Sequence, residues 1–292
     1  MRVLVDADSM VYGCGFAAQR TVYDWIAGNE HEYVEGVAPS AEDLGAVKAL
    51  LPEGWTLEAT ARAEAEPVEN ALALIKRQLL RVAARLDSDG YIYEDLELFL
   101  TGKGNYREDI AKVKPYKGNR LLMEKPVHYK ALRRYLVRQW KAQIVHGVEA
   151  DDIVATISAS YQHDPDQVMI VSQDKDLRTV PGLLYNYRRD TYELITAQEA
   201  LCAFYRQILT GDPTDNIPGC HRCGEKRAEQ VLRATMTESQ MYATVLEEYQ
   251  ASLLKAGCLY AGREAADVVL EMGRLLHLQR RPGELWVPPL ES

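Results

Sequence analysis

The sequence has no apolar run that approaches the ~20 residues of a membrane-spanning helix. Its N-terminus lacks the apolar region and cleavage site of a secretory signal. Cysteines are few and scattered, five in all, so a disulfide framework is not expected. Only Cys220 and Cys223 have a CxxC spacing, and because no second ligand pair lies nearby they are only a weak signal for a zinc site. These absences predict a globular, cytoplasmic protein without a membrane partner.

Positive charge is scarce overall but concentrated in one segment. The net charge of −9 by itself argues against a nucleic-acid partner. Residues 103–141, however, hold twelve Lys or Arg and three acidic residues, a local charge of +9 that leaves the rest of the chain at −18. Tyrosines interleave with these cations and are able to stack on bases. A solvated face is the alternative, but the mixture favours a stripe that binds nucleic acid.

Short apolar runs alternate with helical patterns over most of the chain. We expect strands at 2–6, 96–101, 143–147, 168–172 and 183–187, and helices at 70–86, 127–141 and 150–161. This alternation predicts an α/β fold with a mainly parallel central sheet and helices on both faces. From about residue 196 the pattern is helical to about 277.

Two parts are therefore expected, an α/β core at 1–195 and a helical part at 196–292. Residues 28–66 are acidic, contain several Gly and Pro, and have weak periodicity. This segment is interpreted as an insertion or flexible lobe in the first part.

Acidic residues follow three predicted strands at the point where each strand ends. They are Asp6 and Asp8, then Glu149, Asp151 and Asp152, then Asp174 and Asp176. Because the carboxyl ends of neighbouring parallel strands face one crevice, these groups are expected to converge. Any one of them could be a cap or turn residue. Together they would repel one another without a cation, whereas Mg²⁺ or Mn²⁺ prefers such oxygen ligands.

The loop of an EF-hand is absent, which argues against calcium storage. Divalent metal beside a cationic stripe indicates phosphoryl chemistry instead. Two ions ~4 Å apart can then act on the attacking and leaving oxygens of a phosphodiester.

A second group of candidate residues lies at 209–232, "LTGDPTDNIPGCHRCGEKRAEQVL". Asp212 and Asp215 precede a turn from Gly219 to Gly224, and a helical pattern begins at "EKRAEQVL". Backbone N–H groups of such a turn suit a phosphate, although many such turns only connect helices. With Lys226 and Arg227 following, the region at about 205–235 predicts a helix-hairpin-helix that grips a duplex backbone.

Five motifs resemble those of the structure-specific 5′ nucleases, the family of flap endonucleases and of the 5′ nuclease domains of bacterial DNA polymerase I. They are, in family order, "VLVDAD", "YKGNR" (116–120), "GVEADD", "VSQDKDL" and "GDPTDNIPG". The longer run "GNYREDIAKVKPYKGNRLLMEKP" is most similar to short-tailed-phage 5′→3′ exonucleases, which degrade duplex DNA from 5′ ends and remove RNA primers.

The resemblance implies a phage-encoded, monomeric 5′→3′ exonuclease or flap endonuclease in the bacterial host's cytoplasm. Its expected partners are duplex DNA with 5′ ends, nicks or flaps, and an RNA–DNA hybrid. Residues 103–141 would form a helical arch over the active site.

The resemblance also implies two Mg²⁺ or Mn²⁺ ions and roles for single residues. The first metal site would comprise Asp6, Glu149, Asp151 and Asp152, with Asp8 as a further candidate. The second would comprise Asp174, Asp176 and Asp212, with Asp215 in an outer shell. Lys117 would reach the scissile phosphate, with Arg107 and Arg120 as phosphate contacts and Tyr116 stacked on a base. Further DNA contacts would come from Lys112, Lys114, Gly219, Arg222, Gly224, Lys226 and Arg227, and backbone carbonyls at 219–224 would bind K⁺.

The sequence departs from the family pattern at two places. Gly102 stands where the family usually has a metal-binding Asp, so the first metal site is weakened or Asp8 or Asp152 compensates. Arg222 stands where glycine is common and Cys223 where an aliphatic residue is common. An inactive DNA-structure-binding homologue is therefore one alternative function.

A phosphatase of the haloacid-dehalogenase type, with an aspartyl-phosphate at Asp6, is the other alternative. It leaves the "VEADD" cluster without a role.

Overall fold

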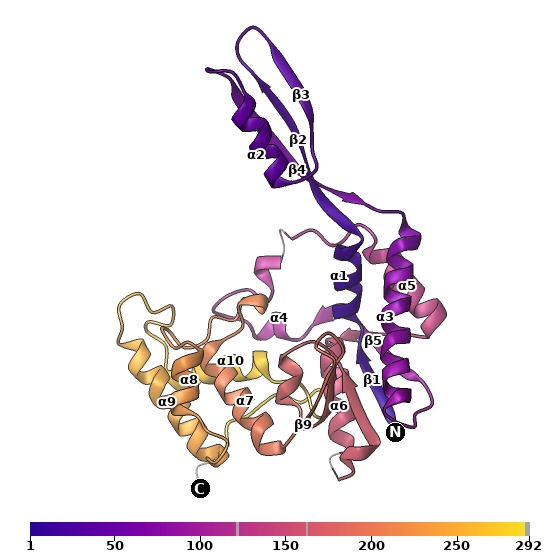
Figure 1. Ribbon diagram of the computed structural model, residues 1–292. Helices are drawn as coiled ribbons and strands as arrows, with labels where there is room; N and C mark the ends of the chain where they lie inside the picture. The colour runs from indigo at the N-terminus through magenta and orange to yellow at the C-terminus, as the bar shows by residue number, and fades with distance from the viewer. Residues whose placement is uncertain (121–122, 162, 290–292) are drawn as a thin grey trace. The chain divides into compact units, whose positions relative to one another are not determined.

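The computed structural model describes residues 1–120, 123–161 and 163–289 (Figure 1). Its larger sheet has six strands in the order β6-β5-β1-β7-β8-β9. The strands are β1 Arg2–Asp6, β5 Leu96–Asn105, β6 Gln143–Gly147, β7 Val168–Val171, β8 Gly182–Asn186 and β9 Thr191–Ile195. All neighbours are parallel except β8 and β9. The predicted α/β class with a mainly parallel sheet is confirmed, and β9 is an additional antiparallel edge strand.

A smaller antiparallel sheet occupies most of the segment interpreted as an insertion or flexible lobe. Its strands, in the order β3-β2-β4, are β2 Gln19–Gly28, β3 Tyr33–Ala38 and β4 Thr56–Ala65, and α2 (Ala41–Leu50) contacts β2 and β3. Trp25 of β2 packs directly over Gly36 of β3, where a side chain would overlap the indole ring. The apolar pattern was weak because most of β3 and β4 is exposed.

Ten α-helices lie within the described residues, and those predicted at 70–86, 127–141 and 150–161 are α3, α5 and α6. Besides α2 they are α1 Asp8–Ala17, α3 Val68–Ser88, α4 Arg107–Ile110, α5 Tyr129–Trp140, α6 Ala150–Ser160, α7 Ala197–Thr210, α8 Glu225–Val231, α9 Glu238–Leu253 and α10 Ala265–Leu276. Short 3₁₀ turns are η1 Gly118–Arg120, η2 Pro165–Gln167, η3 Asp176–Thr179 and η4 Pro213–Asp215. None of the helices in the described ranges is both long and apolar enough to cross a membrane.

The predicted arch at 103–141 is helical only in part. It contains α4, η1 and α5, while residues 111–117 are not helical and residues 121–122 lie outside the described part of the chain. Residues 110, 111, 113 and 116 pack against the C-terminal helices, and Glu271 of α10 accepts hydrogen bonds from the backbone N–H groups of Lys112 and Val113.

The chain forms two compact units, and their bounds differ from the expected boundary at 195/196. One unit comprises residues 10–81 and 125–136, and the other comprises 1–9, 82–124 and 137–292. The helices after residue 196 belong with the larger sheet because Ala200 and Leu278 pack into one buried cluster with Leu4 and Ile170.

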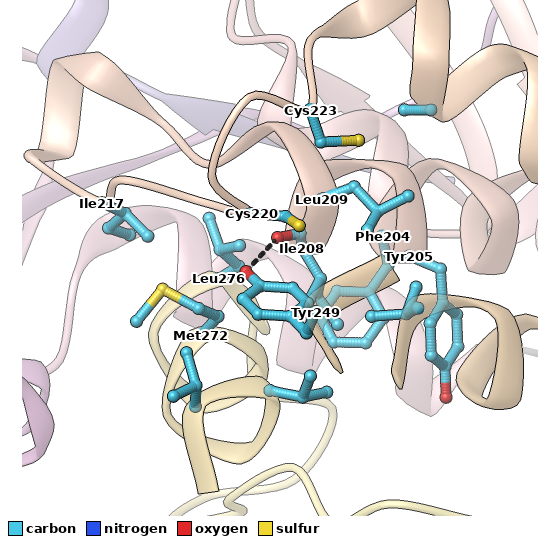
Figure 2. Packing of buried hydrophobic residues seen from close by; sticks show 14 of the residues in the cluster. Phe204, Tyr205, Ile208, Leu209, Ile217, Cys220, Cys223, Tyr249, Met272 and Leu276 are labelled. Carbon is cyan, nitrogen blue, oxygen red and sulfur yellow. Dashed lines mark hydrogen bonds between the residues drawn. The ribbon is translucent and has the colours of Figure 1, made fainter. Parts of the chain in front are cut away.

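A second buried cluster joins α7, α9 and α10 and fixes the loop that follows α7. Figure 2 shows Phe204, Tyr249, Met272 and Ile217 within it, and the Tyr249 hydroxyl donates to the Ile208 carbonyl at 2.8 Å. Because Ile217 is buried in this cluster, apolar packing holds the "GDPTDNIPG" loop against the helices.

Candidate active site

The carboxyl ends of β1 and β7 are joined through Asp6. Its carboxylate accepts the Ser172 hydroxyl at 3.1 Å, and Ser172 in turn accepts the Asp174 N–H at 3.0 Å. Burial, followed by repulsion from Asp8 and Asp174, raises the pKa of Asp6 to about 7. Sequence reasoning missed Ser172, although its place directly after the apolar run of β7 was the available signal.

Asp8 links the ends of β1, β5 and α6. Its Oδ2 accepts the Thr101 N–H at 2.8 Å, and the Thr101 hydroxyl accepts the Ala150 N–H at 2.9 Å. The next residue, Gly102, has no space for a side chain, because a Cβ would overlap the Val145 carbonyl and the His146 ring. A metal-binding aspartate therefore does not fit at position 102 in this arrangement of β5 and β6.

Asp176 lies close to other acids beyond the end of β7. Its Oδ1 accepts the Gln207 amide at 2.7 Å, and its N–H donates to Asp174 at 2.9 Å. Burial, then Asp174 and Asp212, raise the pKa of Asp176 to about 8. Gln207 comes from α7, and no sequence motif could have indicated its contact.

The acids at the N-terminus of α6 form hydrogen bonds and ion pairs within the protein. Glu149 is the N-cap, and the Asp152 side chain accepts the Glu149 N–H at 3.2 Å to complete a capping box. Asp152 is fully buried in a two-hydrogen-bond ion pair with Arg107, which is 1% exposed. In this arrangement Arg107 offers almost no surface to a phosphate, and both Asp152 oxygens already accept hydrogen bonds from the protein.

Lys117 lies among carboxylates. Its ammonium pairs with Glu149 and lies 3.5 Å from Asp215, while Arg120 pairs with Asp215 at 2.5 Å. The Tyr116 hydroxyl contacts both carboxylates, at 2.5 Å from Glu149 and 2.7 Å from Asp215. Burial alone would raise the pKa of Glu149, but Lys117 and then Arg107 bring that pKa below its ordinary value. The Tyr116 hydroxyl thus contacts two acids in this structure, and stacking of its ring on a base stays a prediction.

Two motifs almost 100 residues apart meet at this point. The Lys117 N–H donates to the Asp215 carbonyl at 2.9 Å, and Asn119 and Asn216 each bridge to the backbone of the other motif. Asp212 caps the turn by accepting the Thr214 N–H at 2.9 Å. Gly211 (φ +70°) and Gly219 (φ +65°) have left-handed conformations, and their backbones touch so closely that neither tolerates a side chain.

The stretch predicted as a helix-hairpin-helix is α7, a turn and the short α8. Arg222 is exposed and has a positive φ of 61°, which explains why glycine suits its position. Gly224 and Lys226 are exposed, whereas Arg227 pairs with Glu248 of α9. DNA and K⁺ binding here remain predictions.

The donor chemistry of the site suits a hard divalent cation. Most of the candidate acids with a shifted pKa are shifted upward, namely Asp6, Asp151, Asp176 and Asp215, so a nearby positive charge would stabilise their ionised forms. Nevertheless, within residues 1–120, 123–161 and 163–289 no three His, Cys, Asp or Glu side chains are placed to hold a metal as they stand. Protein cations instead occupy the space between Glu149 and Asp215.

No family model matches the chain. Curated proteins do match it: a 5′-3′ exonuclease of Buchnera aphidicola subsp. Schizaphis graminum is 27% identical over 160 residues, 51% of this chain and 55% of that protein. A flap endonuclease Xni of Shewanella sediminis is 30% identical over 139 residues, 44% of this chain and 54% of that protein. The DNA polymerase I of Bacillus caldotenax is 28% identical over 52% of this chain and 19% of its own length. The chain thus matches about half, or less, of the length of these curated relatives.

Among solved structures, a T5 5′-exonuclease with bound divalent metal ions (zinc) superposes with a TM-score of 0.51. It covers 94% of this chain and 88% of its own, at 15% identity. The resemblance to 5′-3′ exonucleases and flap endonucleases is therefore confirmed, in sequence over about half of the chain and in fold over most of it.

Proposed function

We propose that this chain, similar in sequence and fold to 5′-3′ exonucleases and flap endonucleases, is a divalent-metal-dependent nuclease. It would hydrolyse phosphodiester bonds near 5′ ends of DNA and leave a 5′-phosphate. The observation that carries the proposal is the ion pairing of Lys117 with Glu149 and its approach to Asp215, which supports a cation for the phosphate close to candidate metal ligands.

Two Mg²⁺ or Mn²⁺ ions would lower the pKa of an attacking water and stabilise the leaving oxygen. Asp6, Glu149 and Asp151 are the candidates to hold the first ion, with Asp8 near them. Asp174, Asp176 and Asp212 are the candidates for the second, and Asp215 would orient its neighbours. Asp152 is left out of this set because its oxygens already bind Arg107 and backbone N–H groups.

Lys117 would donate to a non-bridging oxygen of the scissile phosphate. To do so its ammonium must leave Glu149, and the exchange of a carboxylate partner for a phosphate keeps the charge paired throughout. Arg120, about two-fifths exposed, would contact a neighbouring phosphate when released from Asp215.

The substrate would be duplex DNA with a 5′ end, nick or flap, and the same backbone contacts would accept an RNA strand in a hybrid. Lys112 and Lys114 support this, because neither forms an ion pair within the described residues and both precede Lys117 in the chain. The hairpin at 219–224 would hold the duplex backbone with K⁺.

The test is cleavage of end-labelled and internally labelled blunt, nicked and flap duplexes in Mg²⁺, Mn²⁺ or EDTA. Metal-dependent release of short 5′ products is expected, and the preferred substrate separates an exonuclease from a flap endonuclease. A hybrid with a 5′ RNA segment tests primer removal.

The matched controls are Asp174→Ala, which removes a candidate ligand, and Asp166→Ala, an exposed acid outside the site. Binding of DNA without cleavage in every metal would contradict the proposal and favour an inactive DNA-binding homologue.

A further inference from the structure

Arg107 is held on every side by groups of the protein. Its Nη1 and Nη2 donate to the two oxygens of Asp152 at 2.6 and 2.9 Å, its Nε donates to the Leu275 carbonyl at 2.8 Å, and Nη2 also donates to the His277 carbonyl at 3.0 Å. The rings of Tyr106 and Tyr116 lie 4.7 and 5.9 Å from the guanidinium carbon. With 1% of its surface exposed, this guanidinium has no donor directed at solvent.

The Asp152 carboxylate likewise forms all of its contacts with groups of the protein. Besides Arg107, its Oδ1 accepts the Gln279 N–H at 3.1 Å and its Oδ2 accepts the Glu149 N–H at 3.2 Å. The side chain is fully buried. Two oxygens with four hydrogen bonds leave little room for a metal ion to coordinate them.

The pair connects three parts of the chain that are distant in sequence. Arg107 begins α4, Asp152 lies in the first turn of α6, and residues 275–279 include the end of α10 and the residues after it. Glu149, whose backbone is fixed by Asp152, directs its own carboxylate at Tyr116 and Lys117 and lies 3.7 Å from Arg107. The orientation of a candidate catalytic acid therefore depends on a buried ion pair behind it.

We propose that Arg107 and Asp152 are positioning residues that hold Glu149 in place from behind, rather than a phosphate contact and a metal ligand. This inference rests on the proposed nuclease function for its kinetic consequences, but its structural content does not. Removal of either partner of this buried pair is costly because the other charge is then left unpaired and without water.

The first test is Arg107→Lys, which keeps the charge and removes the two-pronged geometry. We expect kcat to fall roughly 10- to 100-fold, the usual range for loss of an outer-shell partner, with KM for DNA unchanged. DNA affinity in EDTA, measured against salt concentration, should match the parent protein. The matched control, Arg120→Ala, should reduce the salt dependence by about one counterion. A reduced salt slope in Arg107→Lys would instead make Arg107 a phosphate contact and overturn the proposal.

The second test compares Asp152→Asn with Asp151→Asn by calorimetric titration of Mn²⁺ without DNA. The neighbouring carboxylate is the matched control, since it is a candidate ligand without an arginine partner in the described chain. Asp151→Asn should lose more Mn²⁺ affinity than Asp152→Asn. The reverse order would show that Asp152 is a ligand.

A third test leaves no unpaired buried charge, and its hydrogen-exchange readout does not depend on nuclease activity. In the double variant Arg107→Met with Asp152→Met, both charges are removed, which buried pairs often tolerate. Hydrogen exchange at the Glu149 and Gln279 amides should accelerate, and cleavage should stay impaired while DNA affinity is retained. Unchanged exchange, or full activity in the folded double variant, would refute the positioning role. If the parent protein cleaves no DNA, the proposed function fails and the exchange result alone decides the positioning role.

Discussion

Glu149 and Asp6 are both buried carboxylates near the carboxyl ends of parallel strands, with 8% and 6% of their surfaces exposed. Glu149 has Lys117 and Arg107 beside it, and these cations overcome the effect of burial and lower its pKa. Among the described residues the Asp6 carboxylate accepts hydrogen bonds from two neutral donors, the Ser172 hydroxyl and the Asp8 N–H, while burial and then Asp8 and Asp174 raise its pKa to about 7. Glu149 thus has cationic partners in the chain that favour its ionised form, whereas burial and neighbouring acids favour the protonated form of Asp6.

This difference has a consequence for metal binding. On the Asp6 and Asp176 side an entering ion must displace protons, so its affinity depends on pH. On the Glu149 side it must compete with an ammonium group that is already part of the chain.

The largest effect is expected for Asp174→Ala, on the side where burial and neighbouring acids raise the pKa of Asp6 and Asp176. Cleavage should fall by far more than the roughly 10- to 100-fold typical of an outer-shell residue, while DNA affinity is retained. Single-turnover cleavage and binding in EDTA measure the two separately. Normal turnover by a folded variant would show that Asp174 is not a metal ligand, and the two sides would then not differ in the way described.

Lys117→Ala tests the side with its own cation. The cleavage rate should fall roughly 100- to 1,000-fold, as for loss of one donor to transition-state charge, with a much smaller loss of DNA affinity. Because the competing ammonium is gone, Mn²⁺ affinity without DNA should rise. Equal losses of rate and DNA affinity would make Lys117 only a phosphate anchor.

Gly102→Asp tests whether position 102 can accept the aspartate that the 5′ nuclease pattern usually has there. The new side chain would overlap the Val145 carbonyl and the His146 ring, so we expect destabilisation of about 1–3 kcal/mol and no gain in activity. Urea unfolding measures the first and cleavage the second. Increased Mn²⁺ affinity without loss of stability would show that β5 shifts to admit a ligand.

Stability of the metal-free protein should depend on pH through Asp6 and Asp176, two acids whose pKa values are raised. The folded-state pKa values of Asp6 and Asp176, about 7 and about 8, lie above their ordinary value of 3.8. The folded chain therefore binds more protons than the unfolded chain, and this contribution is complete below pH 3.8 and is lost as the pH rises through 7 and 8.

The melting temperature should thus fall by a few degrees between about pH 6.5 and 9, and Mg²⁺ should oppose the fall at the alkaline end. Asp176→Asn should flatten the profile. A melting temperature that rises over this interval in the parent protein would contradict the assigned pKa directions.

The smallest effects are expected for Lys112→Ala and Lys114→Ala, which lie outside both sides. Each should weaken DNA binding modestly and lower the salt dependence by about one counterion, with kcat unchanged. A large fall in kcat for either variant would show that this lysine contributes to the chemical step as well as to DNA binding.

Local sequence patterns were sufficient for much of the fold. The strands predicted at 2–6 and 143–147 are β1 and β6 without a shift, and α6 begins at the predicted residue. Apolar runs and caps act over a few residues, so they can be read without knowing what lies opposite. The β2–β4 sheet escaped prediction because its exposed strands carry little apolar alternation.

By itself the sequence determined the chemistry available to this protein: clusters of acids after three strands, a basic segment, and motifs in the order of the 5′ nucleases. The tertiary structure decided how that chemistry is divided. Arg107 and Asp152 lie 45 residues apart, and Lys117 and Glu149 lie 32 residues apart, so no local pattern could show that each pair neutralises itself. Charge pairing depends on distance in space and on exclusion of water, and both are set only when the chain has folded.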